Sequence, residues 1–285
     1  MKQQLIECVP NFSEGRDLAI IKQITNEIES VDGVKLLDVD PGAATNRTVI
    51  TFVGTPEAVI EAAYKAIVKA GEIIDMSKHK GEHARMGATD VCPLIPVANI
   101  SMEETSQWAV KLAKKVGETT HIPTYLYGAS QSDTKRNVLS IIRTGEYEGF
   151  FEKIKRPEWK PDFGPSIYSA RSGATVIGAR DFLIAYNINL NTTSTRIANR
   201  IAFDVRETGR VVREGNPFTG KIKTDEYGEP VRIPGTCKAV QAVGWYIDEY
   251  KVAQVSANLT NFNITPIHTF FDAVQDSCIE RGVRI

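Results

Sequence analysis

Two histidines and a carboxylate lie within five residues of one another in the segment His79-Lys80-Gly81-Glu82-His83. The segment leads through Arg85 to Gly87, between an amphipathic helical pattern over 56–75 and an apolar run over 91–97. Loops that are held by rigid elements often carry catalytic side chains. Because imidazole gives and takes protons near neutral pH, this loop is the first candidate for acid–base chemistry.

The same five residues match H-x-x-E-H, a pattern in which two histidines bind zinc and the glutamate activates water. That chemistry needs a helix that turns both imidazoles toward one ion, whereas Gly81 interrupts the segment and no third ligand is evident beside it. Histidines that are solvated or hydrogen-bonded in the core are the more ordinary explanation. We therefore keep a metallohydrolase based on His79, Glu82 and His83 as an alternative, and predict a site without metal.

Charged residues near the ends of neighbouring strands give this loop potential partners. Asp40 ends the strand expected over 34–40, Arg47 lies at the start of the next strand, and Arg85 follows the histidines. If these strands pair, a carboxylate can orient an imidazole while arginines hold substrate carboxylates through bidentate hydrogen bonds. Asp40 is therefore a candidate for orienting the catalytic histidine, and Arg47 and Arg85 are candidates for binding substrate carboxylates.

A second candidate site is the segment from Gly164 to Gly173. Glycine and proline at its start and glycine at its end allow the backbone to approach a planar ligand closely. Tyr168 and Arg171 are able to stack on such a ligand or pair with it, although loops of this composition are more often plain connectors. The run 173–179 does not match a dinucleotide-binding fingerprint, and the sequence contains no phosphate-binding P-loop.

The composition is that of an ordinary globular protein. The 285 residues include 34 Lys and Arg and 35 Asp and Glu, which gives a net charge of -1. With so small a net charge, no overall electrostatic field would attract nucleic acid or an anionic membrane. The four cysteines are widely spaced and form no CxxC pair, and no apolar run reaches the ~18 residues of a membrane span. These features favour a cytoplasmic protein without nucleic-acid or membrane partners.

Hydrophobic periodicity supplies the elements that position these residues. In the first part of the chain, strands are expected over 5–9, 34–40, 46–53, 91–97 and 124–127. Helices are expected after the turn at 10–15 and over 56–75, 101–115 and 133–143. Thr55 and Pro56 form the start signal of one helix, and Ser101 with Glu104 forms a capping box at the start of another.

Residues 145–165 are typical of an irregular connector that leads to a second unit. There we expect strands over 182–189, 239–246, 252–258 and from 282, helices over 195–206 and 265–281, and a polar loop over 209–235. The expected fold is α/β of the α+β type, with two β-α-β-β-α subdomains, mixed sheets, helices on the outer faces and a groove between the subdomains. We place the subdomains at 1–178 and 179–285, and expect the closing strand of the second to be cut short.

Several short motifs, in order along the chain, resemble those of the formiminotransferase family. They are Glu7 to Gly15, Leu37 to Asp40, Asn46 to Thr48, Gly81 to Gly87, Tyr125 to Gly128, Pro161 to Ser166 and Gly244 to Tyr246. They extend from the first expected strand to the hairpin of the second unit, and the resemblance continues nearly to the last residue.

The resemblance implies two subdomains that face each other across a groove for folate, in a homodimer. It implies transfer of the formimidoyl (formimino) group from N-formimidoyl-L-glutamate to N5 of tetrahydrofolate, in histidine degradation. Tetrahydrofolate would be the co-substrate, and no metal would be needed. The products would be 5-formimidoyltetrahydrofolate and L-glutamate.

The resemblance also implies roles for individual residues. The catalytic histidine would be His83, with His79 shaping the loop. Folate binding would fall to ten consecutive residues: Gly164, Pro165, Ser166, Ile167, Tyr168, Ser169, Ala170, Arg171, Ser172 and Gly173. The middle of this segment differs from that of animal members, whose fused cyclodeaminase domain is also absent here.

Two further alternatives use the same groove. A glutamate formyltransferase would employ the same histidine but move a formyl group. A catalytically silent folate-binding or scaffold protein would bind folate without turnover. Paired assays with formimidoyl- and formylglutamate separate these alternatives.

Overall fold

The computed structural model describes residues 2–81, 83–216 and 219–285. The chain divides into two compact units, residues 1–180 and 181–285. Each unit has a hydrophobic core of its own. Within the described ranges, no helix is both long enough and apolar enough to cross a membrane.

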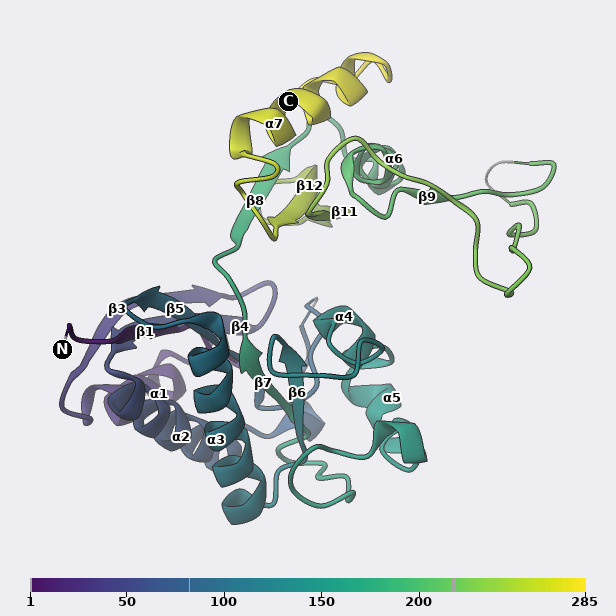
Figure 1. The fold of residues 1–285 in the computed structure, drawn as a ribbon. Coiled ribbons are helices and arrows are strands. Elements are labelled where there is room, and N and C mark those ends of the chain that lie inside the picture. The colour runs from purple at the N-terminus through teal and green to yellow at the C-terminus, as the bar shows by residue number, and fades with distance from the viewer. Residues whose placement is uncertain (1, 82, 217–218) are drawn as a thin grey trace. The chain divides into compact units, whose positions relative to one another are not determined.

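The first unit is built on a seven-stranded mixed sheet (Figure 1). The strands are β1 (Leu5–Cys8), β2 (Asn11–Phe12), β3 (Val34–Gly42), β4 (Arg47–Gly54), β5 (Thr89–Ala98), β6 (Thr124–Gly128) and β7 (Thr175–Ala179). Their order is β1-β4-β2-β5-β7-β6, with β3 paired to β4. β7 lies between β5 and β6 and is parallel to both, whereas the other pairs are antiparallel.

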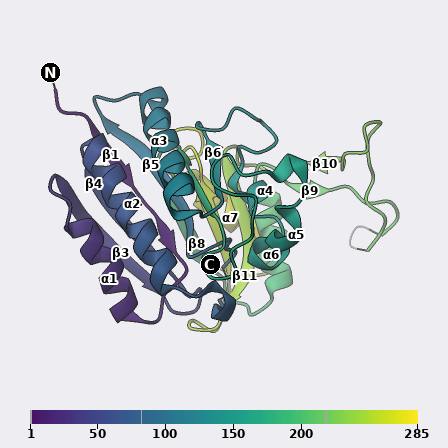
Figure 2. The same cartoon turned by 90° about the horizontal axis from the view of Figure 1, so that it is seen from below.

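Three amphipathic helices pack side by side on this sheet (Figures 1 and 2). They are α1 (Leu18–Glu29), α2 (Pro56–Ile73) and α3 (Met102–Thr120). The predicted start signals are confirmed, because Thr55 caps α2 and the reciprocal Ser101–Glu104 bonds of a capping box open α3. Burying the apolar face of each helix against the sheet is the main source of stability for such a layer.

The region after β6 differs from the prediction. Instead of one helix over 133–143, only α4 (Leu139–Ile142) forms, because the Asp133 carboxylate accepts from the Lys135 amide and the Asn137 carbonyl accepts from Gly128. The expected connector contains α5 (Glu146–Lys153) and a short 3-10 helix (Pro157–Trp159). Phe150 of α5 is buried edge-on against Tyr125, a contact that the local sequence pattern did not reveal.

The second unit contains a three-stranded antiparallel sheet in the order β11-β12-β8. Its elements are β8 (Ile184–Asn189), α6 (Thr195–Val205), β11 (Val240–Ile247), β12 (Val252–Leu259) and α7 (Ile267–Ile279). The predicted hairpin is confirmed by continuous pairing of β11 with β12. Together, the mixed sheet of the first unit, the antiparallel sheet of the second and the packed helices confirm an α/β fold.

Two further expectations for this unit need correction. The polar segment 209–235 includes a short ladder between β9 (Arg210–Val211) and β10 (Arg232–Ile233), so its two ends are held together. The expected strand from 282 is wrong, because residues 282–285 form no strand. Instead, Arg284 exchanges hydrogen bonds with Asn191, which satisfies the backbone of the segment locally.

Candidate active site

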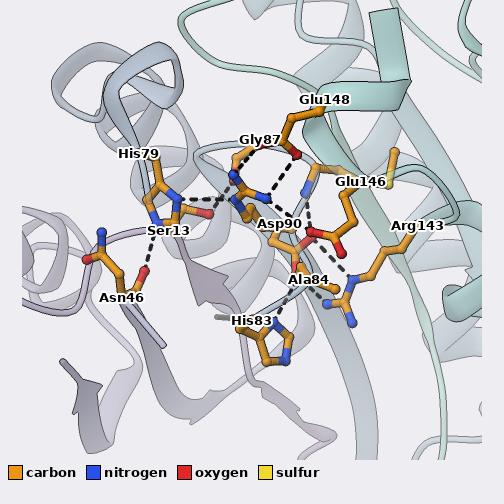
Figure 3. A network of polar contacts seen from close by, with 12 residues as sticks. Ser13, Asn46, His79, His83, Ala84, Gly87, Asp90, Arg143, Glu146 and Glu148 are labelled. Carbon is orange, nitrogen blue, oxygen red and sulfur yellow. Dashed lines mark hydrogen bonds and ion pairs between the residues drawn. The ribbon is translucent and has the colours of Figure 1, made fainter. Parts of the chain in front are cut away.

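The histidine loop is held against the turn that precedes β4 (Figure 3). His79 Nε2 lies 2.8 Å from the carbonyl oxygen of Asn46, and the Asn46 amide donates to the carbonyl of Lys80. The side-chain oxygen of Asn46 accepts from the amide of Gly15. A Cβ at Gly81 would come within 2.3 Å of the Thr45 carbonyl oxygen, so only glycine allows this close approach.

Arg85 joins the loop to α5. Its Nε donates to His79 Nδ1 at 3.2 Å, and its terminal nitrogens donate to Glu146 and Glu148 at 3.0 and 2.6 Å. Both ring nitrogens of His79 are therefore engaged, with Nε2 as donor and Nδ1 as acceptor. Burial is the main reason that the His79 pKa is lowered, so this ring is a neutral anchor of the loop.

Among the described residues, no hydrogen bond is made by the second ring nitrogen of His83. Its Nδ1 lies 2.6 Å from the Ala84 carbonyl oxygen, which can only accept, so Nδ1 carries the proton and Nε2 carries the lone pair. Burial, followed by the positive charges of Arg47 and Arg143, lowers the pKa of His83 to about 4, against the opposing effect of Asp90. At neutral pH, the imidazole is therefore an uncharged base.

A buried carboxylate fixes the far end of the loop. Asp90 is fully buried in β5, and its oxygens accept hydrogen bonds from the Met86 amide and the Arg143 guanidinium (Figure 3). Sequence reasoning missed both side chains of this pair. Asp90 was detectable as a charged residue at the head of an otherwise apolar strand, because a buried charge needs a partner.

The predicted site residues Asp40 and Arg47 differ in their exposure to solvent. Asp40 is exposed in β3, and the Nδ1 atom of His83 bonds to Ala84. Arg47 is half-buried at the start of β4 and donates to the side-chain oxygen of Asn11 at 2.5 Å. Burial lowers the Arg47 pKa, while the charges of Asp90 and Asp40 act in the opposite sense. Asp40 therefore influences the site through its charge on Arg47.

The two segments that the sequence singled out lie against each other. Gly87 and Gly173 form an antiparallel bridge, and the amides of Ala88 and Ala174 donate to the carbonyls of Ser172 and Met86 at 2.9 and 3.1 Å. Gly173 has φ +65°, and a Cβ there would approach the Met86 carbonyl oxygen to 2.2 Å. Backbone hydrogen bonds therefore fix the end of the 164–173 segment beside the histidine loop.

Both units match models of a known protein family. Residues 5–180 match the N-terminal subdomain of the formiminotransferase domain, and residues 185–285 match the remainder of that domain. The chain belongs to the formiminotransferase family.

Relatives with whole-chain similarity fall into two groups. Formimidoyltransferase-cyclodeaminase of Mus musculus is 50% identical over 99% of this chain and 48% of its own length, so the chain spans about half of such relatives. Proteins named glutamate formimidoyltransferase from Thermoplasma acidophilum and Streptococcus pyogenes are 41% and 34% identical. The chain covers 84% and 86% of their lengths, and they cover 98% and 99% of it.

In this formiminotransferase domain, several side chains of the 164–173 segment have partners of their own. Tyr168 packs against the rings of Tyr147, Phe150 and Phe151, and Arg171 donates to the Glu72 carbonyl at 2.6 Å. Ile167, in contrast, is 70% exposed. The segment is thus anchored at Tyr168 and Arg171.

The alternative metal site would use His79, Glu82 and His83. Glu82 lies outside the described residues. His79 uses its Nδ1 lone pair to accept from Arg85. In the described part of the formiminotransferase domain, no group of three or more His, Cys, Asp and Glu side chains is arranged to hold a metal ion.

Proposed function

We propose that the chain transfers the formimidoyl group from N-formimidoyl-L-glutamate to N5 of tetrahydrofolate, giving 5-formimidoyltetrahydrofolate and L-glutamate in histidine degradation. Two relatives that the chain matches over nearly its whole length are named glutamate formimidoyltransferase. The structural observation that carries the proposal is the position of His83. A neutral imidazole whose Nε2 carries the lone pair lies in the loop that is bridged to the proposed folate segment.

The reaction requires a proton to move between two nitrogens. N5 attacks the formimidoyl carbon, and the new C–N5 bond makes N5 cationic and acidic. His83 takes the N5 proton at Nε2 and then gives a proton to the glutamate nitrogen as its bond to carbon breaks. Because burial and neighbouring cations disfavour the imidazolium, its proton passes readily to the departing nitrogen, and His83 returns to its neutral form.

Arg47 is the proposed ligand for a substrate carboxylate. Arg85 and Arg143 are each paired with carboxylates, whereas Arg47 donates to the neutral amide of Asn11. Among these three described arginines, Arg47 is the one without a direct carboxylate bond. Its charge is therefore available to a glutamate carboxylate, and Asp40 is proposed to act as a charged neighbour of Arg47.

Folate binding is proposed for residues 164–173, mainly through backbone groups and the exposed side chains at the centre of the segment. Following the family resemblance, we also propose that the protein works in the cytoplasm as a homodimer. The proposal assigns no role to a metal ion.

The test is a transfer assay that follows glutamate release, with wild type, His83→Gln and His121→Asn. His121 is an exposed residue with φ +59°, a conformation that asparagine tolerates, so it controls for loss of a histidine. We expect a fall of about 100-fold or more for His83→Gln and wild-type activity for His121→Asn. Full activity of His83→Gln would overturn the proposed role.

The same assay separates the alternative functions. Turnover with formylglutamate and none with formimidoylglutamate would identify a formyltransferase. Loss of activity on chelation, restored by zinc, would favour the metallohydrolase. Folate binding without turnover of either donor would indicate a silent binding protein.

A further inference from the structure

Lys153 is a buried cation that the proposed chemistry does not use. It is the last residue of α5, is 7% exposed, and its Nζ lies 3.7 Å from the centre of the Trp159 ring. The ammonium donates to three backbone carbonyls, those of Ile141, Ile142 and Thr144, at 3.0, 2.6 and 3.1 Å. All three donors of the ammonium are thus directed at one turn of the backbone.

The turn that Lys153 binds carries Arg143. The carbonyl of Ile142 belongs to the peptide group immediately before Arg143, and the carbonyl of Thr144 belongs to the second peptide group after it. α4, which ends here, has four residues and no side-chain cap at its start, so it has little stability of its own. A cation that accepts no hydrogen bond but donates to the last carbonyls of a helix stabilises that helix end.

Arg143 in turn reaches the catalytic loop. Its guanidinium is bonded to both oxygens of Asp90, and Asp90 also accepts from the Met86 amide in the loop that contains His83. The charged groups that act on His83 come from three elements: Arg47 of β4, Asp90 of β5 and Arg143 beyond α4. A shift of the 141–144 turn would therefore move one of the three charges around the imidazole.

We propose that Lys153 is a positioning residue of the reaction, which aims the Arg143 fork at Asp90 by holding the carbonyls of Ile142 and Thr144, the residues that flank Arg143. The proposal rests on the proposed function for its catalytic readout. It assigns to α5 a role in the site in addition to the ion pairs of Arg85. Lys153 itself contacts no substrate.

The experiment compares Lys153→Met with Lys155→Met. Lys155 has an exposed ammonium that pairs with Glu152 and covers the ring of Phe151, so the control removes a cation over an aromatic ring two residues away. We expect kcat to fall by about 10- to 100-fold in Lys153→Met and by less than about 2-fold in Lys155→Met. Equal activity of the two variants would overturn the proposal.

A double-mutant cycle tests whether Lys153 acts through Arg143. Arg143→Lys keeps a charge beside Asp90 but loses the fork, so Lys153→Met should add less than about a 3-fold loss in that background. Losses that simply multiply would assign Lys153 a purely structural role and overturn the proposal. If Lys153→Met does not fold, the same double-mutant cycle is measured with Lys153→Gln. The glutamine amide can still donate to two carbonyls.

A measurement on the substrate-free protein tests the role of Lys153 independently of the proposed function. The His83 imidazole is titrated by nitrogen NMR and assigned by its absence in His83→Gln. We expect the His83 midpoint to rise in Lys153→Met, because the displaced Arg143 charge no longer opposes protonation, and to stay unchanged in Lys155→Met. A shifted midpoint in a protein without transfer activity would reject the function and keep the positioning role, whereas an unshifted midpoint would reject the role.

Discussion

Gly87 and Gly173 face each other in an antiparallel bridge, although 85 residues separate them in the sequence. The bridge fixes the exit of the histidine loop against the end of the proposed folate segment. A side chain at either position would meet backbone oxygen rather than a flexible side chain. This contact makes the relative placement of the two segments sensitive to a single methyl group.

Gly173→Ala is expected to disturb the folate segment. The new Cβ would lie 2.2 Å from the Met86 carbonyl oxygen, and φ +65° is unfavourable for alanine. We expect the free energy of unfolding to fall by about 1–3 kcal/mol and the KM for tetrahydrofolate to rise. Gly149→Ala is the control, since its Cβ would meet nothing within 4 Å. Equal KM values for the two variants would contradict this prediction.

The stability of the protein should decrease on acidification through His83. Its folded pKa of about 4 lies below its ordinary value of 6.5, so the unfolded chain binds the extra proton first as the pH falls. The fold should lose roughly 1–3 kcal/mol between pH 6.5 and 4 from this group. Urea unfolding at a series of pH values should show a shallower decline in His83→Gln than in wild type. Parallel curves would argue against a depressed pKa.

Arg85 is expected to matter for both stability and activity. Arg85→Met removes the hydrogen bond to His79 and the ion pairs with two glutamates, which are partly exposed and can be rehydrated. We expect a loss of about 2 kcal/mol in thermal or urea unfolding, together with reduced turnover. Lys22→Met, which breaks the exposed pair with Glu29, should change stability by less than about 0.5 kcal/mol. Comparable losses in the two variants would refute a special role of Arg85.

Asp204 should be important for the second unit. It lies in the last turn of α6, within a cluster that includes Arg210, Ser277 and Arg281. Asp204→Asn would leave the partly buried Arg281 and the half-exposed Arg210 without their countercharge, and we expect the second unit to lose about 1–2 kcal/mol. Hydrogen exchange should accelerate in β8, β11 and β12 more than in β4 and β5. Asp248→Asn, which breaks an exposed pair with Lys251, should leave both patterns unchanged.

Local signals predicted the helices α1, α2, α3, α6 and α7 and the β11–β12 hairpin. The caps at Thr55 and Ser101 act within three residues of themselves, so they are readable without knowledge of the tertiary structure. α5 was missed because Gly145, in a left-handed conformation, opens it without a side-chain cap. β7 was not identified as a strand, because all of its residues are buried between two parallel neighbours and show no alternation.

The candidate site also contains residues that local sequence revealed and residues that it did not reveal. The histidine loop was found from residue types and spacing, whereas the choice of His83 came from family resemblance. The Asp90–Arg143 pair joins positions 53 residues apart, and the sequence holds no short-range signal for such a pairing. Contacts of this kind depend on the assembled sheet and the turn that follows α4.

The hydrogen bonds of Asn46 have a consequence for the order of events during refolding. Its side chain and carbonyl bind Gly15, His79 and Lys80, which lie 31 to 34 residues away in either direction. Such distant contacts form only after the β3–β4 hairpin and α2 have brought the chain segments together. We therefore expect refolding chains to recover transfer activity in a later phase than the one in which the β3–β4 hairpin and α2 form, which far-UV circular dichroism follows.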